Sequence, residues 1–231
     1  MKERGMIFNG EMVRAILDGR KTQTRRPVKF PVHDKNLGCE LAGNELAGEL
    51  SAGNYLNSAF GKPGDRIWVR ETWSDVNLDG APAVAYRADD EVYDLMENES
   101  LLDEDGAFNY QDTRVSKYQF AAWHSDLISG IEGNWRPSIH MPRWASRILL
   151  EITNVRVERL NSMHDVDAMR EGIQNLTTCS HSDFGIPGVV NAQHPVRAFQ
   201  LLWESIYGTD SWHANPWVWV IEFKRVEGGA A

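Results

Sequence analysis

One long stretch of alternating side chains constrains the fold of this chain more than any other feature. Residues 146–160 indicate a single β-strand whose apolar positions are Ile148, Leu150, Ile152, Val155 and Val157. The alternation shifts phase near Asn154, which predicts a bulge or bend at that point. A strand of this length needs partner strands, so the order of the remaining elements decides which kind of sheet it joins.

The other predicted elements do not alternate as the βαβ units of a parallel sheet do. Asn9 and Gly19 are typical of the start and end of a short amphipathic helix over residues 10–18. Further strands are expected at residues 66–73, 83–87 and 217–223, and further helices at residues 162–172 and 195–207. The helix at 162–172 would open on a capping box formed by Ser162 and Asp165. This order favours an α+β fold in which a β-barrel is decorated by short helices.

Three segments lack a clear period. Residues 31–62 are expected to be long and irregular, and residues 173–193 are expected to form a loop. Residues 75–134 are acidic and are predicted to be a large insertion, because they do not show a core of their own. We therefore expect a single domain over residues 1–231, with a frayed tail at 227–231.

Composition narrows the functional classes. The formal net charge of −9 argues against nonspecific nucleic-acid binding over the whole surface, although a local basic pocket is compatible with it. The two cysteines, Cys39 and Cys179, have no spacing typical of a disulfide framework or a zinc site. The sequence predicts no metal and no cofactor. It shows no signal peptide and no membrane-spanning window, so a cytoplasmic protein without a membrane partner is expected.

A basic stretch at residues 19–27 is the main candidate for a ligand site. Its cationic side chains are Arg20, Lys21, Arg25 and Arg26. Neighbouring cations and burial both lower the pKa of a lysine, so Lys21 is a candidate proton acceptor. Thr24 offers a hydroxyl nucleophile if a base lies within reach. A solvated basic turn is the alternative interpretation of the same residues.

Two carboxylates are singled out by their positions. Glu171 lies at the end of a predicted helix, where the helix dipole disfavours a negative charge, so a cation from the basic stretch is expected to hold it. Glu71 falls on the apolar face of a strand and is expected to form an ion pair with an arginine. An exposed helix-end glutamate remains the alternative for Glu171.

Aromatic and cationic residues of the middle of the chain complete the candidate set. The loop at residues 135–144 is restrained by two prolines and carries His140, Arg143 and Trp144. Trp68 lies on the other face of the strand that leads to Glu71. These side chains are predicted to contact the ligand, by stacking or by hydrogen bonding.

The helix that ends in Gly19, followed by Lys21, Thr24 and Arg26, resembles the signature of the ASCH domain, a member of the PUA-like β-barrel superfamily. Thr24 stands where the usual pattern has glutamate, which makes the stretch similar to that of the bacterial acetylcytidine amidohydrolases. This resemblance implies that Lys21 accepts a proton, Thr24 is the nucleophile and Glu171 donates a proton.

The chain also resembles a longer group of ASCH-like proteins encoded by phages and prophages. The resemblance rests on the stretches at residues 135–147 and 215–220 and covers most of the chain, except parts of 31–60 and 88–130. We therefore expect a PUA-like fold with a pocket built from Lys21, Thr24, Arg26, Glu71 and Glu171, roofed by residues 140–144.

Three functions are compatible with these residues. The first is an amidohydrolase that removes an acyl group from N-acylated cytidine or a similar modified nucleoside. The second is a non-catalytic module that binds RNA or a modified nucleotide, with aromatic side chains stacking the base and arginines holding phosphate. The third is a metal-independent ribonuclease, which the resemblance also allows. The sequence leaves the oligomeric state open.

Overall fold

The computed structural model describes residues 1–178 and 181–226, so Cys179 and the predicted tail at 227–231 lie outside the described residues. The chain forms two compact units. The first unit comprises residues 1–2, 15–66 and 151–225, and the second comprises residues 3–14, 67–150 and the segment that begins at 226.

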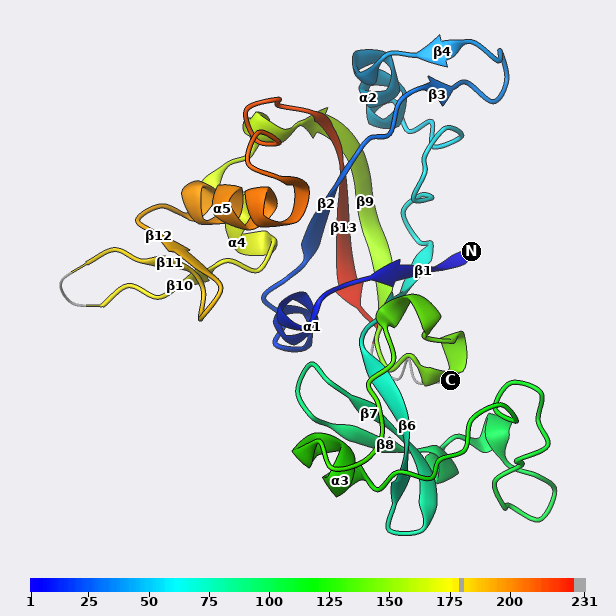
Figure 1. Ribbon diagram of the computed structural model, residues 1–231. Helices are drawn as coiled ribbons and strands as arrows, with labels where there is room; N and C mark the ends of the chain where they lie inside the picture. Colours follow the sequence, from blue (N-terminus) through cyan, green and yellow to red (C-terminus); the bar gives the residue numbers. More distant parts are fainter. Residues whose placement is uncertain (179–180, 227–231) are drawn as a thin grey trace. The chain divides into compact units, whose positions relative to one another are not determined.

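Three strands lie side by side in the first unit, in the order β9 (Leu149–Arg159), β13 (Trp217–Arg225) and β2 (Gln23–Pro27) (Figure 1). Strand β13 pairs antiparallel with β2, so that Val220 lies opposite Arg25 and Glu222 lies opposite Gln23. Residues 218–221 of β13 are all buried, as expected of a central strand whose two faces are covered.

Strand β9 confirms the predicted phase shift. Ile152 is buried, Thr153 and Asn154 are not, and the buried positions resume at Val155 and Val157. The buried face therefore changes from even to odd residue numbers at Asn154. As a consequence, the even-numbered residues that follow present polar side chains on the opposite face.

Two helices pack together in the first unit. Helix α5 (Pro195–Tyr207) begins at a proline, as predicted, and lies against α4 (Asp165–Arg170) and the strands β11 and β12 (Figure 1). The predicted cap at Ser162 is wrong, because Leu160–Ser162 forms a 3₁₀ turn. The backbone N–H of His164 instead donates to the Asp167 carboxylate at 3.1 Å, so α4 begins two residues later than a Ser162 cap would allow.

The two segments of the first unit that were predicted to be irregular are partly ordered. Residues 31–62 contain β3 (Val32–His33), β4 (Glu40–Leu41) and α2 (Gly43–Ser51), and residues 173–193 contain β10 (Gln174–Asn175), β11 (Phe184–Ile186) and β12 (Val190–Ala192). Helix α2 escaped prediction because it carries two glycines and lacks a Ser, Thr, Asp or Asn cap. Burial of Leu46 and Leu50 stabilises it.

The second unit contains β1 (Glu3–Ile7), most of β5 (Arg66–Arg70), a three-stranded antiparallel sheet and α3 (His124–Ser129). The sheet runs in chain order through β6 (Trp73–Leu78), β7 (Ala81–Tyr86) and β8 (Val92–Asp94). Helix α1 (Gly10–Leu17) begins in this unit, where the Asn9 side chain accepts a hydrogen bond from the Met12 N–H at 2.9 Å. This contact confirms Asn9 as the predicted cap.

The expectation that residues 75–134 lack a core is wrong. A cluster of buried side chains in the second unit draws mainly on this segment and includes Val84, Leu95, Leu101, Phe108, Val115, Tyr118 and Phe120. The aromatic members follow one another at irregular spacing, since they come from an isolated bridge and irregular segments rather than from one helix or strand. Periodicity therefore gave no sign of this core.

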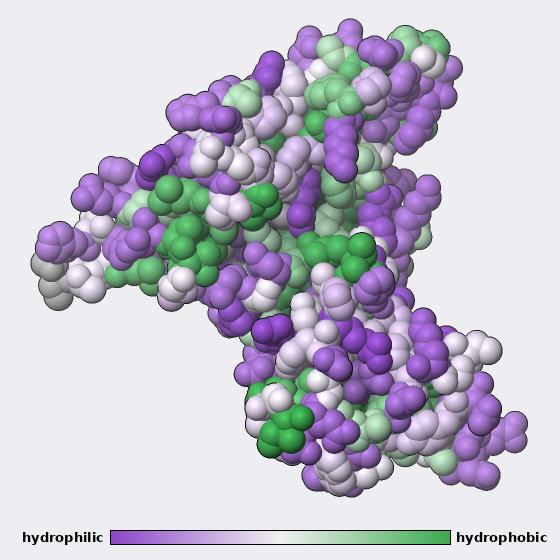
Figure 2. Space-filling model, in the orientation of Figure 1, coloured by the Kyte–Doolittle hydropathy of each residue, from purple (hydrophilic) through white to green (hydrophobic). Residues whose placement is uncertain are grey.

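These elements define an α+β fold. The described strands form open sheets, without a closed barrel, and the PUA-like barrel therefore stays an expectation. Within residues 1–178 and 181–226, no helix combines the length and the apolar character that crossing a membrane requires. Apolar surface is visible over α3 (Figure 2), where Trp123, Ile128 and Ile131 are exposed.

The packing of α2 against β13 gives a first prediction. A methyl group at Gly43 would overlap the indole ring of Trp217, whereas Gly48 of the same helix has open space around its Cα. Gly43→Ala should lower the free energy of unfolding by about 1–3 kcal/mol through overpacking. Gly48→Ala should raise it by about 0.5–1 kcal/mol, because alanine favours a helix interior. Urea denaturation measures both, and equal effects would contradict the observed packing of α2.

Candidate functional site

The basic stretch is fixed in place by backbone hydrogen bonds at its start. Gly19 adopts a φ of 74°, which a glycine takes without strain, and it ends helix α1 as predicted. The Lys21 N–H then donates to the Ala15 carbonyl, and the Thr22 N–H donates to the Arg170 carbonyl, both at 2.9 Å. The second bond ties the segment before β2 to the C-terminal end of α4.

Lys21 and Glu171, which are 150 residues apart in the sequence, form a buried ion pair. The Lys21 Nζ lies 2.7 Å from Glu171 Oε2 and 2.8 Å from the Glu171 backbone carbonyl. The side chains are only 0% and 2% exposed. The predicted contact between Glu171 and a cation of the basic stretch is thus confirmed, while the catalytic roles of both residues stay predictions.

Burial changes the protonation chemistry of Lys21. Loss of hydration lowers the pKa of its ammonium group, and the adjacent Glu171 carboxylate opposes this shift without overcoming it. Arg25 and Arg26 act in the same direction as burial, because each adds a nearby positive charge. Lys21 is therefore closer to releasing its proton than an exposed lysine, as the sequence predicted.

Arg25 extends the pair into a larger cluster. Its guanidinium group donates to Glu171 Oε1 at 3.2 Å and to Glu158 Oε1 at 2.7 Å, and it lies 3.7 Å from Asp167. Arg156 then joins Glu158, Asp167 and Glu222. We call these residues the buried charge network after its buried centre, which is Lys21, Arg25 and Glu171. Its other members are half-buried, and they are Arg156, Glu158, Asp167 and Glu222. Three cations thus face four carboxylates, and the network carries a net negative charge if all are ionised.

Strand alternation explains which residues of β2 join this network. Gln23 and Arg25 share one face of the strand, while Thr24 and Arg26 point to the other face, where Thr24 lies opposite Ile221. Thr24 is 2% exposed, and its hydroxyl forms no hydrogen bond within the described part of the chain. The structure therefore brings Lys21 and Glu171 together but does not bring Thr24 into contact with them.

Gln23 is the unexpected member of this face. Its side chain is fully buried, yet neither Oε1 nor Nε2 has a hydrogen-bond partner among the described residues. A buried amide without partners costs about 1–3 kcal/mol per group, so such a side chain calls for a water molecule or a ligand. Gln23 lies opposite Glu222 and therefore on the same side as the buried charge network.

Arg20 behaves differently from its neighbours. Its Nε and one terminal nitrogen bind the Asp18 carboxylate at 3.2 and 2.7 Å, and its other terminal nitrogen donates to the Gly172 carbonyl at 3.2 Å. The side chain is 32% exposed. Arg20 thus links the end of α1 to the turn after Glu171. Arg26 is partly buried and lies on the face of β2 opposite to Arg25.

Glu71 belongs to the second unit, where it forms the predicted ion pair with Arg147. Two hydrogen bonds of 3.0 Å join the groups, and Arg147 also binds Asp89 and lies 4.0 Å above the Tyr86 ring. Burial raises the pKa of the Glu71 carboxyl group against the opposing effect of Arg147. Glu71 also lines a hollow of about 380 Å³ beside Thr72.

The remaining predicted ligand contacts also lie in the second unit. Trp68 is covered by the Arg70 guanidinium at 5.4 Å, and Arg143 binds Glu3 at 3.2 Å. Trp144 donates from Nε1 to the Arg114 carbonyl at 3.1 Å and packs against the core cluster. His140 is exposed. Among these residues, His140 alone presents a largely exposed side chain.

Sequence reasoning missed most of the buried charge network. Glu158, Asp167, Arg156 and Glu222 were not singled out, nor was Gln23. One signal was available, since the phase shift at residue 154 takes Arg156 and Glu158, which share a face of β9, off the buried face of the strand. The sequence does not show which strands lie next to β9, so it could not indicate that Arg25 of β2 and Glu222 of β13 would join these side chains.

Comparisons with known proteins give no relative from which a role for this site could be taken. No protein-family model, no curated protein and no solved structure matches the chain. The resemblance to ASCH proteins therefore stays a hypothesis carried by the sequence motifs, and the site has to be interpreted from its own geometry.

The desolvated ammonium of Lys21 gives a second prediction. Its pKa in the folded state is below the ordinary 10.5, so the unfolded state binds more protons between these two values. The free energy of unfolding of the wild type should therefore gain from rising pH across that window, up to about 10.5, relative to Lys21→Met. Lys21→Met should itself cost about 3 kcal/mol at neutral pH, the lower end for a broken buried pair, because Arg25 still holds Glu171.

Urea denaturation of the wild type and Lys21→Met between neutral pH and about pH 11 measures this difference. Lys224→Met is the matched control, since Lys224 also pairs with a carboxylate of the first unit but is 62% exposed. A constant difference between the wild type and Lys21→Met over the whole pH range would show that Lys21 titrates as an exposed lysine does.

Proposed function

We propose that this protein hydrolyses the amide bond of an N-acylated nucleoside such as N-acetylcytidine, at the pair formed by Lys21 and Glu171. One observation carries the proposal: a desolvated lysine of the Gly-x-Lys-x-x-Thr stretch is hydrogen-bonded at 2.7 Å to a carboxylate from a distant segment. A buried lysine whose pKa is lowered and which contacts a carboxylate is typical of acid–base sites.

The chemistry that suits this pair depends on a single shared proton. Transfer of one proton from the Lys21 ammonium to Glu171 gives a neutral amine, which is a base, and a carboxylic acid, which is a proton donor. Burial favours this neutral form, whereas Arg25 favours the ion pair by stabilising the carboxylate. The pair can therefore supply both groups that amide hydrolysis needs without exchanging protons with solvent.

In the proposed reaction, the Thr24 hydroxyl adds to the acyl carbon and gives its proton to the Lys21 amine. Glu171 protonates the leaving amino group of the nucleoside as the C–N bond breaks, which leaves an acyl ester on Thr24. Water then attacks the ester, transferring a proton to Glu171, while Lys21 returns its proton to the Thr24 oxygen. The two steps release cytidine and acetate and restore the starting pair.

This mechanism requires a rearrangement around β2, because Lys21, Glu171 and Thr24 are all buried and Thr24 lies on the other face of β2. The rearrangement would have to admit the substrate and bring the Thr24 hydroxyl to Lys21. Gln23 supports a polar ligand close to the same site, since its unpaired amide presents an NH₂ donor group and a carbonyl acceptor. A nucleobase edge or an acyl amide carries the complementary pair of groups.

A second function, binding without chemistry, is favoured by the burial of Lys21 and Glu171. Lys21 already donates to two oxygens of Glu171, and this contact holds α4 against the segment before β2. If that structural role is the whole role of the pair, the protein binds a nucleoside or RNA without chemistry. The two functions differ in whether the acylated nucleoside is consumed.

The hydrolase proposal predicts turnover of N-acetylcytidine to cytidine and acetate by the purified protein. Thr24→Ser keeps the hydroxyl and should retain activity, whereas the isosteric Thr24→Val should lower it by at least about 100-fold. Glu171→Gln should also abolish turnover, because an amide cannot give up the proton that the leaving group needs. Chromatography of the reaction mixture measures the rate of cytidine formation by the wild type and the three variants.

Thermal unfolding of the same samples shows whether each variant is folded. Equal activity in Thr24→Val and the wild type would remove Thr24 from the mechanism. If the wild type leaves N-acetylcytidine and related acylated nucleosides intact but binds them or RNA, the non-catalytic function replaces the hydrolase. In that case we expect a shallow dependence of RNA affinity on salt, because the net charge is −9.

A further inference from the structure

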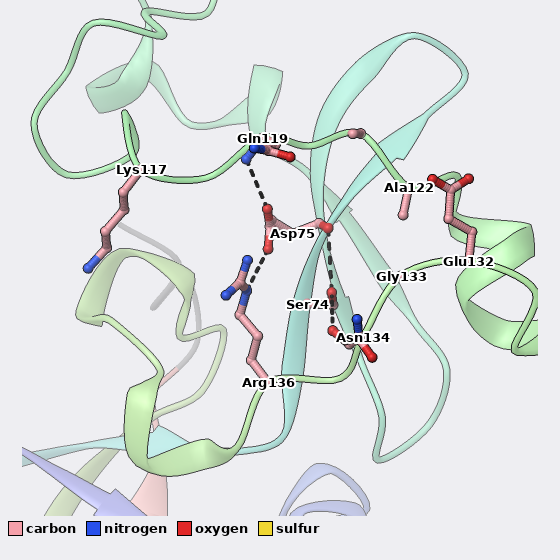
Figure 3. A pocket seen from close by; sticks show the side chains of 10 residues that line it. Ser74, Asp75, Lys117, Gln119, Ala122, Glu132, Gly133, Asn134 and Arg136 are labelled. Atoms are coloured by element: carbon pink, nitrogen blue, oxygen red, sulfur yellow. Dashed lines mark hydrogen bonds and ion pairs between the residues drawn. The ribbon is translucent and has the colours of Figure 1, made fainter.

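A polar cleft in the second unit has no part in the proposed hydrolysis. It has a volume of about 440 Å³ and is lined by polar and small residues of β6 and of the segments at residues 117–122 and 132–136 (Figure 3). This volume falls within the range of sites for small molecules, about 300–1,000 Å³. Several of its charged groups were not singled out from the sequence.

Arg136 is held rigidly at the floor of this cleft. Its Nε donates to Asp75 Oδ1 at 2.6 Å, and its backbone exchanges two hydrogen bonds with Trp73. The guanidinium carbon lies 5.3 Å from the Tyr118 ring centre and 5.8 Å from that of Trp73. Asp75 is fixed in turn by the backbone N–H groups of Gln119 and Phe120.

This rigidity leaves part of Arg136 available. Its two terminal nitrogens form no hydrogen bond within residues 1–178 and 181–226, and the side chain is 43% exposed. An arginine that is already ordered loses little conformational entropy when it binds a ligand. Two terminal N–H groups in one plane suit an oxyanion that accepts both.

Lys117 adds a second cation to the same place. Its ammonium lies 5.2 Å from the centre of the Tyr118 ring, and no carboxylate pairs with it in the described part of the chain. Lys117 and Arg136 both line the cleft, with Arg136 reaching Asp75 and Lys117 lying to one side of them (Figure 3). The cleft holds two cations and two carboxylates, Asp75 and Glu132, so it is neutral overall, and an anion would be held by the N–H groups of Arg136 and Lys117 that are free within the described residues rather than by a net positive charge.

The rest of the cleft limits what the ligand can be. Gln119 and Asn134 offer amide groups, Glu132 offers a carboxylate, and no aromatic ring is present among the described residues that line the cleft. Without a ring to stack on, a nucleobase has no favoured position. Donors and acceptors spread over a polar surface suit the hydroxyl groups of a sugar.

We propose that this cleft binds a small sugar phosphate, with the phosphate between Lys117 and Arg136 and the sugar hydroxyls at Gln119, Asn134 and Glu132. The proposal is independent of the hydrolase proposal, since it uses other residues and involves no bond cleavage. Either one can fail while the other holds.

Calorimetric titration of the full chain with ribose 5-phosphate, ribose and inorganic phosphate tests the site. Ribose 5-phosphate should bind with a dissociation constant below about 1 mM, phosphate should bind more weakly, and ribose should not bind. Lys117→Met should weaken ribose 5-phosphate at least about tenfold without changing the thermal midpoint, because Lys117 is exposed and unpaired. Arg136→Gln should weaken it more.

Arg114→Gln is the matched control, because Arg114 is also 43% exposed but its guanidinium is occupied by Asp112 and the Ser100 carbonyl. It should leave binding unchanged. Absence of ribose 5-phosphate binding, or equal binding by the wild type and a folded Lys117→Met, overturns the proposal. Equal affinity for phosphate and ribose 5-phosphate overturns the sugar part of it. Hydrolysis of N-acetylcytidine should be the same in Lys117→Met and the wild type.

Discussion

The first unit depends on a lysine that cannot remain in the interior without compensation. An isolated buried ammonium group would lose its hydration with nothing in return, and here the Glu171 carboxylate and carbonyl replace the lost water. Glu171 in turn needs the cation, since it ends a helix whose dipole disfavours negative charge. Arg25 shares the carboxylate, so the pair cannot rearrange without disturbing β2. One desolvated contact therefore ties together the end of α1, the end of α4 and the edge of the sheet.

The surrounding strands supply the charges that this contact needs. The phase shift in β9 at Asn154 keeps Arg156 and Glu158 out of the apolar core, and the register of β13 brings Glu222 opposite Gln23 on the neighbouring strand. Without the shift, the buried positions would continue at even numbers and these two side chains would replace apolar ones in the core. An irregularity of a single residue in one strand is thus a condition for the whole network.

The sequence predicted local structure well where pattern and capping agree. The cap at Asn9, the end of α1 at Gly19 and the helix that begins at Pro195 depend on neighbouring residues, and the structure confirms them. The contact of Glu171 with a cation was also predictable, because a helix terminus imposes it. Prediction failed where distant packing decides, as in α2 and in the core of residues 75–134, and the unpaired Gln23 amide depends on register alone.

Both proposed sites contain a carboxylate that contacts a cation, but the contact serves proton transfer in one site and anion binding in the other. In both, a carboxylate fixes a cation, which removes the entropy of a long side chain. At Lys21 the Glu171 carboxylate contacts the ammonium group itself, so the two charges compensate each other. In the proposed reaction, one proton moves between Lys21 Nζ and Glu171 Oε2. At Arg136 the carboxylate binds only Nε and leaves the terminal nitrogens open. A closed pair suits proton transfer and a half-occupied guanidinium suits anion binding, because reactivity depends on which donors the protein itself has already used.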